Sequence, residues 1–134
     1  MKKTLWGFVS LLTALLFSSC TVESTDPDYA SVITGTYKMT SYVTKSGSST
    51  PSANDNMVIE RKSDKKAIVT IDYATGEDND VEADDVSIVK TGDDYNLTQS
   101  FTNAELKATV SGTILTYRLD YNDGSYVIIS ATKK

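Results

Sequence analysis

From Ile33 to the C-terminus, apolar and polar residues alternate with a period of two, and this pattern constrains the fold more than any other feature of the chain. The run Ala67–Tyr73 shows it most clearly, because every second residue is apolar. β-Branched and aromatic residues at alternate positions are typical of half-buried strands. No segment shows the helical spacing of an amphipathic helix. The sequence therefore predicts an all-β domain over residues 33–134.

Short turn-forming segments divide this domain into eight extended runs, with seven connections too short for a crossover helix. The runs are Ile33–Val43, Met57–Arg61, Ala67–Tyr73, Val81–Lys90, Tyr95–Phe101, Leu106–Val110, Leu115–Tyr121 and Ser125–Thr132. The longest connection is the polar loop Lys45–Asn56, and the strongest hairpin signal is Asp123-Gly124. Eight is a number at which a meander can close on itself. The count favours an eight-stranded antiparallel up-and-down β-barrel over an open or sandwiched sheet.

The first 19 residues have the layout of a secretory signal peptide. Lys2 and Lys3 supply a positive start, and the mostly apolar run Thr4–Phe17 follows them. This run is too short to span about 30 Å of hydrocarbon comfortably as a helix. An ordinary cleaved signal or a permanent anchor is the alternative to a lipoprotein signal.

The end of this segment, Leu16-Phe17-Ser18-Ser19-Cys20, resembles the lipobox of bacterial lipoproteins. It departs from the usual pattern in having Phe17 three residues before the cysteine. The resemblance implies cleavage after Ser19 and acylation of Cys20, for example with palmitate. Two or more acyl chains give a stable anchor, whereas one holds only weakly. The expected location is the cell envelope, with the outer membrane as the anchoring bilayer.

Residues 20–32 comprise the lipidated cysteine and a polar, acidic stretch with Pro27, which predicts a flexible tether. Glu23, Asp26 and Asp28 resemble the acidic stretch that follows the lipidated cysteine in surface-exported lipoproteins of Bacteroides-type bacteria. Because other tethers share this composition, the sequence leaves open whether the domain faces the periplasm or the cell surface.

Charge and composition exclude several function classes. Two of the 13 basic residues lie in the segment 1–19. The mature chain therefore has 11 basic and 18 acidic residues, and its formal charge is −7. That balance argues against a nucleic-acid partner, because phosphate contacts draw on clustered Lys and Arg. Histidine is absent and Cys20 is the only cysteine. The chain therefore offers no Ser-His-Asp or Cys-His arrangement and no Cys or His zinc site, and we expect no catalytic residues, metal or cofactor.

The acidic run from Glu77 to Asp85 is the one segment that could supply oxygen ligands to calcium. Ala83 and Val89 occupy the positions where an EF-hand loop needs its glycine and its final glutamate. The run also offers carboxylates for glycoside hydrolysis, but nothing places them in a cleft. A solvated hairpin tip that discourages edge pairing is the favoured interpretation.

Gly35-Thr36-Tyr37 in the first run resembles the first-strand motif of lipocalin-like domains. In that family a glycine stands two residues before an aromatic, usually Trp, that closes one end of the barrel, and a basic residue packs over the aromatic. The resemblance implies that Gly35 and Tyr37 form the barrel-closing motif. Arg118 and Lys133 are the candidates for the basic residue. Tyr37 in place of Trp is a departure from the pattern.

The connections at the end opposite Gly35 include the longest loop, so that end is the predicted mouth. Apolar or aromatic side chains on the inward parity of the strands would line it. The predicted ligand-binding residues are Met39, Val43, Met57, Tyr73, Tyr117 and Tyr121. The same tyrosines could instead fill the core and stack across strands.

Two functions from different classes fit these features. The first is a non-enzymatic, membrane-anchored, lipocalin-like module that binds a small apolar or amphipathic ligand. The second is an interaction module, similar to small barrel lipoproteins that inhibit proteases, whose surface engages a protein or glycan. A hollow of several hundred Å³ in the barrel favours the first and a filled barrel the second. The oligomeric state is left open.

Overall fold

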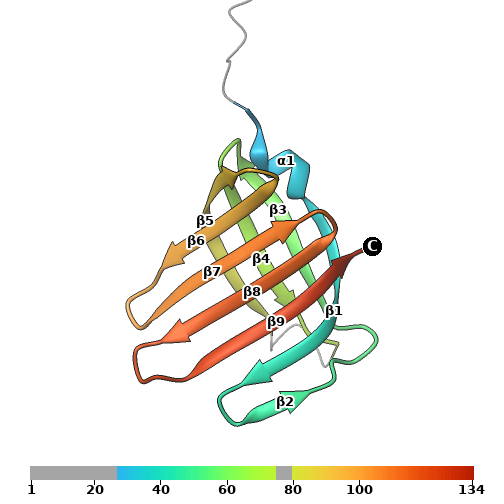
Figure 1. The fold of residues 1–134 in the computed structure, drawn as a ribbon, viewed down its shortest axis with the longest axis vertical. Helices are drawn as coiled ribbons and strands as arrows, with labels where there is room; N and C mark the ends of the chain where they lie inside the picture. The colour runs from blue at the N-terminus through green and yellow to red at the C-terminus, as the bar shows by residue number, and fades with distance from the viewer. Residues whose placement is uncertain (1–26, 75–79) are drawn as a thin grey trace, which may run out of the picture.

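The computed structural model describes residues 27–74 and 80–134, and this part of the chain is nearly all β (Figure 1). One short helix, α1 (Tyr29–Ile33), precedes the strands. The strands are β1 (Gly35–Thr44), β2 (Gly47–Ser49), β3 (Asn56–Ser63), β4 (Lys66–Asp72), β5 (Val81–Thr91), β6 (Asp94–Ser100), β7 (Ala104–Ser111), β8 (Ile114–Tyr121) and β9 (Tyr126–Lys133).

The strands close into an antiparallel barrel. Consecutive strands pair from β3 to β9, and β1 pairs with both β3 and β9, which joins the two ends of the meander. Short β2 pairs with the last residues of β1 and is an extra strand outside the eight-stranded ring. The predicted all-β fold and the closed eight-stranded barrel are confirmed.

Alternating residues from all eight ring strands fill the interior. The largest fully buried side chains on the strands include Tyr37, Ile59, Leu97, Leu115 and Ile129. Within the two described ranges, tyrosine is the only residue type with a polar side-chain group that is buried in the core. The middle of the barrel is therefore packed with side chains, as expected for a ring of eight strands.

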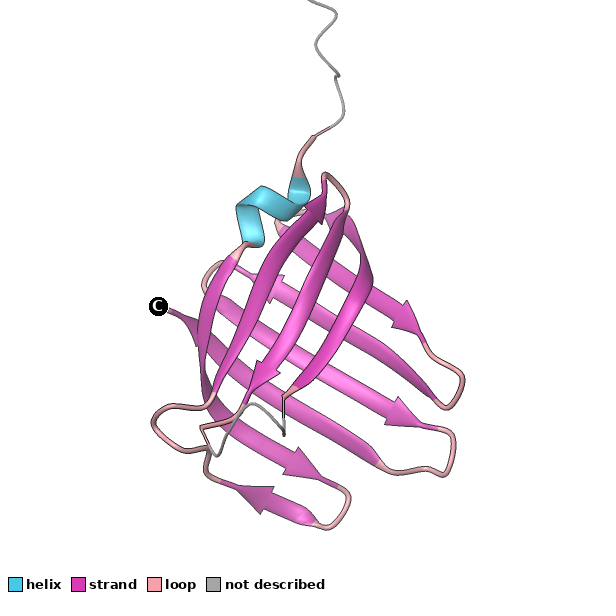
Figure 2. Ribbon diagram, turned by 180° about the vertical axis from the view of Figure 1, so that it is seen from behind, coloured by secondary structure: helices cyan, strands magenta, loops and turns pink. Residues whose placement is uncertain are grey.

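The two ends of the barrel differ (Figure 2). At one end α1 lies across the opening, beside the β3–β4 turn. At the other end lie the segment from β1 to β3, the end of β4, the start of β5, and the β6–β7 and β8–β9 connections, and no helix of the described residues covers this end. We call these the closed end and the mouth. They correspond to the two ends that the sequence predicts.

The structure corrects two boundaries. Residues 29–32, which the sequence assigns to the tether, belong to α1, and Ala30 and Ile33 are fully buried against the barrel. The loop predicted at Lys45–Asn56 contains β2, and Asn56 begins β3. Both elements are short, so neither produces a periodic signal that sequence analysis could detect.

A register shift in β1 moves one predicted residue to the other face. Met39 pairs with Ala131 and Ser41 with Ser130, so Thr40 is an extra residue in the ladder. After the bulge, Tyr42 pairs with buried Ile129 and packs against the core. The prediction that Val43 faces inward with Tyr37 and Met39 is wrong, because one extra residue reverses the alternation.

Candidate functional site

Tyr37 organises the closed end. Its ring is fully buried, and its hydroxyl donates a hydrogen bond of 2.7 Å to the Ile33 carbonyl, which ends α1. Burial raises the pKa of this phenol above its ordinary value. The Lys133 ammonium lies 5.8 Å from the ring centroid and donates to the Val32 carbonyl at 3.4 Å. One aromatic ring therefore connects β1, α1 and β9.

Gly35 gives Lys133 room to reach that ring. A Cβ atom at Gly35 would lie 2.8 Å from Lys133 Cε, and the backbone φ of +149° is one that L residues rarely adopt. Arg118, the other candidate, lies outside the barrel, where it pairs with Asp120 and stacks 5.2 Å from the Tyr126 ring. The basic residue over Tyr37 is Lys133.

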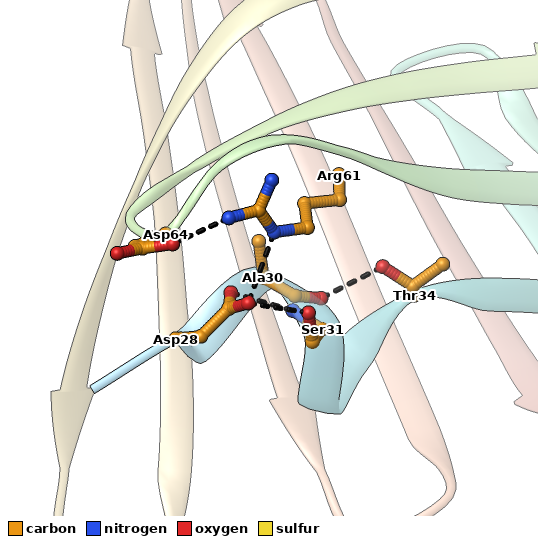
Figure 3. A network of polar contacts seen from close by, with 6 residues as sticks. All are labelled: Asp28, Ala30, Ser31, Thr34, Arg61 and Asp64. Atoms are coloured by element: carbon orange, nitrogen blue, oxygen red, sulfur yellow. Dashed lines mark hydrogen bonds and ion pairs between the residues drawn. The ribbon is translucent and has the colours of Figure 1, made fainter. Parts of the chain in front are cut away.

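A polar network holds α1 against the β3–β4 turn (Figure 3). Asp28 caps the helix by accepting hydrogen bonds from the backbone N–H (3.1 Å) and hydroxyl (2.6 Å) of Ser31. Arg61 of β3 bridges Asp28 at 3.0 Å and also pairs with Asp64. The Ala30 N–H donates to the Asp64 carbonyl at 3.1 Å. The closed end is thus sealed by a capped helix.

A first hollow of about 450 Å³ opens at the mouth, between β1, β4 and the segment that follows β2. Its walls are Met39, Tyr42, Ser49, Thr50, Pro51, Asp55 and Tyr73. Met39 is almost fully buried, and Tyr42 and Tyr73 are half-buried with their rings against the core. The hollow therefore combines apolar surface from Met39 and the two tyrosine rings with polar groups, a combination that suits an amphipathic molecule.

Phenol groups gather on the inner side of the mouth. Burial raises the pKa of Tyr73 far above its ordinary value, and the neighbouring Tyr42, which shares a hydrogen bond with Tyr73, raises it further. Burial likewise raises the pKa of Tyr117, with smaller contributions from Tyr121 and Tyr42. Because the pKa of Tyr73 and of Tyr117 is raised, both phenols are protonated at neutral pH and can donate hydrogen bonds to a ligand.

Asp55 fixes the wall of the first hollow. Its carboxylate accepts hydrogen bonds of 2.8 Å from the backbone N–H groups of Ser52 and Ala74, and its carbonyl accepts from the Met39 N–H at 3.1 Å. One side chain therefore joins the segment after β2 to the segment after β4. The loop positions at this wall are set by a carboxylate rather than by apolar packing.

A second hollow of about 540 Å³ opens at the mouth between β5 on one side and β6 to β8 on the other. Val81, Phe101 and Tyr121 line it and are 46%, 40% and 40% exposed. Ala83, Leu119 and Tyr117 lie deeper in the same hollow. This second hollow is the more apolar of the two.

Four of the six predicted ligand-binding residues line one of the two hollows, and two do not. Met39 and Tyr73 line the first hollow, and Tyr117 and Tyr121 line the second. Met57 is fully buried in the core and lines neither hollow, and Val43 lies on the outward face. Sequence reasoning missed Tyr42 because of the bulge, although its aromatic character at the end of a strand was visible. It also missed Phe101, whose position at the β6–β7 connection carried no separate signal.

Other predicted features lie partly outside the described residues. Cys20 and residues 77–79 of the acidic run are among these. Of the rest of that run, Asp80 accepts from the Tyr73 N–H at 3.0 Å, and Asp85 pairs with Lys62 and Lys66. Within residues 27–74 and 80–134, no group of three acidic, His or Cys side chains could hold a metal ion. In the same ranges, no helix is long and apolar enough to cross a membrane.

Comparison with known proteins bears on the fold. No family model and no curated protein matches the sequence. Among solved structures, the barrel is similar to a "putative outer membrane protein" of Bacteroides fragilis, with a TM-score of 0.57 and 17% identity over 78% of this chain. The match covers 52% of that protein, so this chain spans about half its length. A redesigned β-barrel is also similar, with a TM-score of 0.52 and 16% identity over 81% of this chain and 96% of the design. These similarities establish the β-barrel fold.

Proposed function

We propose that this chain is a lipoprotein of the bacterial cell envelope whose lipocalin-like barrel binds a small amphipathic molecule at its mouth, without catalysis. The observation that carries the proposal is the difference between the two ends. One end is sealed by α1, Tyr37 and Lys133, and the other holds two hollows, both with tyrosines in their walls, of which the second is mainly apolar. Sites for small ligands are concave and mostly apolar, with a few polar groups that set the orientation.

The closed end supports the lipocalin-like assignment. Gly35, Tyr37 and Lys133 meet there as the glycine, aromatic and basic residue of the family motif do. The aromatic ring is buried and serves as a plug rather than as a binding surface. The motif therefore supports family membership, and the ligand is expected at the other end of the barrel.

The envelope location rests on the signal segment and Cys20, and the similarity to the Bacteroides fragilis protein is consistent with it. Acyl chains on Cys20 would hold the domain at the outer membrane without a transmembrane helix.

Binding can be tested with Nile red, an uncharged apolar dye whose fluorescence rises in apolar surroundings. We expect saturable binding to the folded protein, weakened by Tyr73→Ala and unchanged by Tyr126→Ala, since Tyr126 lies on the outer face of β9 under Arg118. Thermal unfolding of both variants checks that they fold. Native mass spectrometry of protein purified from membranes should also show a bound small molecule. If neither saturable dye binding nor a bound molecule is found, the proposal is wrong.

One observation favours the alternative, an interaction module for a protein or glycan. Ile59, Val69 and Leu97 fill the middle of the barrel, so both hollows are confined to the mouth half. A partner could then cover the mouth without entering the barrel. The same dye titration separates the two functions, because a surface used only for a macromolecule need not bind Nile red saturably.

A further inference from the structure

β5 and β6 separate from one another toward the mouth. Their ladder ends at the pair Ser87 and Thr98. Beyond that pair, β5 continues to pair with β4 as far as Val81, and β6 continues to pair with β7 as far as Ser100. The two strands diverge on this side of the barrel (Figure 1, Figure 2). The second hollow lies in the resulting gap, which we call the β5–β6 cleft.

Apolar side chains are concentrated at the rim of this cleft. Val81 comes from β5, Phe101 from the β6–β7 connection and Tyr121 from the end of β8, and all three are at least 40% exposed. They are half of the six large apolar side chains that are exposed in the described part of the chain. Apolar side chains gathered over a hollow mark a binding surface, whereas single exposed ones do not.

The side-chain oxygen of Gln99, the residue before cleft residue Ser100, is buried and lacks a partner. Gln99 is the residue after Thr98, the last β6 residue that pairs with β5. It lies two residues after buried Leu97, so both lie on the inward face of β6. One end of its side-chain amide, the carbonyl oxygen, is buried without a hydrogen-bonding partner. Buried polar groups are almost always satisfied, and an exception calls for an explanation such as a ligand or water.

The charge of the cleft limits what it can bind. Its lining contains no Lys or Arg, and its one acidic residue is Glu82, which is exposed. The first hollow likewise lacks a basic residue and contains Asp55, whose carboxylate is already engaged by two backbone N–H groups. An anion entering either hollow would lose hydration without gaining a counter-charge. The chain as a whole, with a net charge of −5, also repels anions.

We propose that the β5–β6 cleft binds an uncharged amphipathic molecule, whose apolar chain lies against Val81, Phe101 and Tyr121 and whose hydroxyl group hydrogen-bonds to the Gln99 amide. This inference rests on the proposed function and names the class of its ligand. It excludes fatty-acid anions, which share the apolar chain but carry a carboxylate. The apolar chain of the ligand is thus expected in the β5–β6 cleft and not in the first hollow.

The test compares three probes with the same ten-carbon chain: monodecanoylglycerol, decanoate and decyltrimethylammonium, each below its critical micelle concentration. Calorimetry gives the affinities, and amide chemical shifts of the full barrel domain locate the site. We expect monodecanoylglycerol to bind at least about tenfold more tightly than either charged probe, a difference that calorimetry resolves. The largest shifts should fall at Val81 and Phe101.

Matched variants test the cleft itself. Val81→Glu adds a carboxylate to the cleft, and Val89→Glu makes the same change at an exposed valine of β5 outside it. We expect the first to weaken monodecanoylglycerol binding about tenfold or more and the second to leave it unchanged. Gln99→Leu should weaken binding of the same probe without lowering the unfolding temperature, because it removes a buried unsatisfied group.

The outcomes separate this inference from the proposed function. Tighter binding of decanoate or of decyltrimethylammonium overturns the uncharged class and leaves the proposed function standing. Shifts confined to Met39 and Tyr73 overturn the cleft as the site, again with the proposed function intact. An unchanged affinity in Gln99→Leu removes the amide from the site. Absence of binding by all three probes and by Nile red overturns both.

Discussion

The ammonium of Lys133 lies over the Tyr37 ring, 5.8 Å from its centroid, and the two residues are directly paired across β1 and β9. The pair forms where the first and last strands of the barrel close the ring. A cation over an aromatic face is attracted by the ring quadrupole, by about 0.5–1 kcal/mol at exposed sites. The same pair therefore lies both in the β1–β9 ladder that closes the barrel and at its sealed end.

Tyr37→Ala is expected to lower the free energy of unfolding by about 3–5 kcal/mol, the usual cost of deleting a large buried side chain. Tyr37→Phe keeps the ring and removes only the hydrogen bond to Ile33, so it should cost about 1 kcal/mol. Denaturant unfolding of both variants measures the two values. An unfolding midpoint unchanged by Tyr37→Ala would contradict the role of this residue as the plug.

Gly35→Ala tests the close approach of Lys133. The positive φ alone is expected to cost about 1–3 kcal/mol. Gly47→Ala is the matched control, because Gly47 has a similar φ of +143° but no atom within 4 Å of the added Cβ. We expect Gly35→Ala to be the more destabilising, and the added mutation Lys133→Ala to remove part of the excess. Equal effects at the two glycines would show that the contact with Lys133 contributes nothing.

Alkaline pH should destabilise the barrel through the mouth tyrosines. Burial raises the pKa of Tyr117 and Tyr73 in the folded state above the ordinary value of 10.0. Below pH 10 both states are protonated and the stability is complete, and as the pH rises above 10.0 the unfolded state ionises first and the stability falls. Tyr117→Phe should reduce this fall. Thermal unfolding of the variant and of the unaltered protein at several pH values between about 7 and 11 measures the effect, and an equal fall in the two proteins would be the contrary result.

Asp55→Ala should cost about 1–3 kcal/mol, because two backbone N–H groups lose a charged acceptor. Asp72→Ala, at the end of β4, is the control for removal of a carboxylate near the mouth. We also expect weaker Nile red binding in Asp55→Ala only. If the two variants have the same stability and dye affinity, Asp55 does not shape the first hollow.

Cys20→Ala should release the domain from membranes without changing its stability, because Cys20 precedes the first element of the described fold in the sequence and is the proposed lipid attachment site. Fractionation after a carbonate wash, with unfolding of the soluble form, measures both effects. Retention of the variant in the membrane fraction would show that something other than the acyl chains anchors the protein.

The strand order of this barrel was predictable because alternation and turn residues are local signals. Lys133 over Tyr37 was predictable only as one of two candidates, since the choice depends on which strand lies beside β1. The bulge at Thr40 has no local sequence signal. Because of it, Tyr42 faces inward at the mouth and Val43 faces outward. The separation of β5 and β6 depends on how far each strand pairs with its other neighbour, which no single segment encodes.

The sealed end is also the end at which the chain enters the barrel, because α1 connects directly to β1. Seven residues lie between Cys20 and the helix cap Asp28, and the eight Cα–Cα steps from Cys20 to Asp28 can span at most about 28 Å. Acyl chains on Cys20 would therefore tie the barrel to the bilayer through its closed end, the end opposite the two hollows. A bound molecule would then enter and leave at the end of the barrel that is farther along the structure from the lipid attachment.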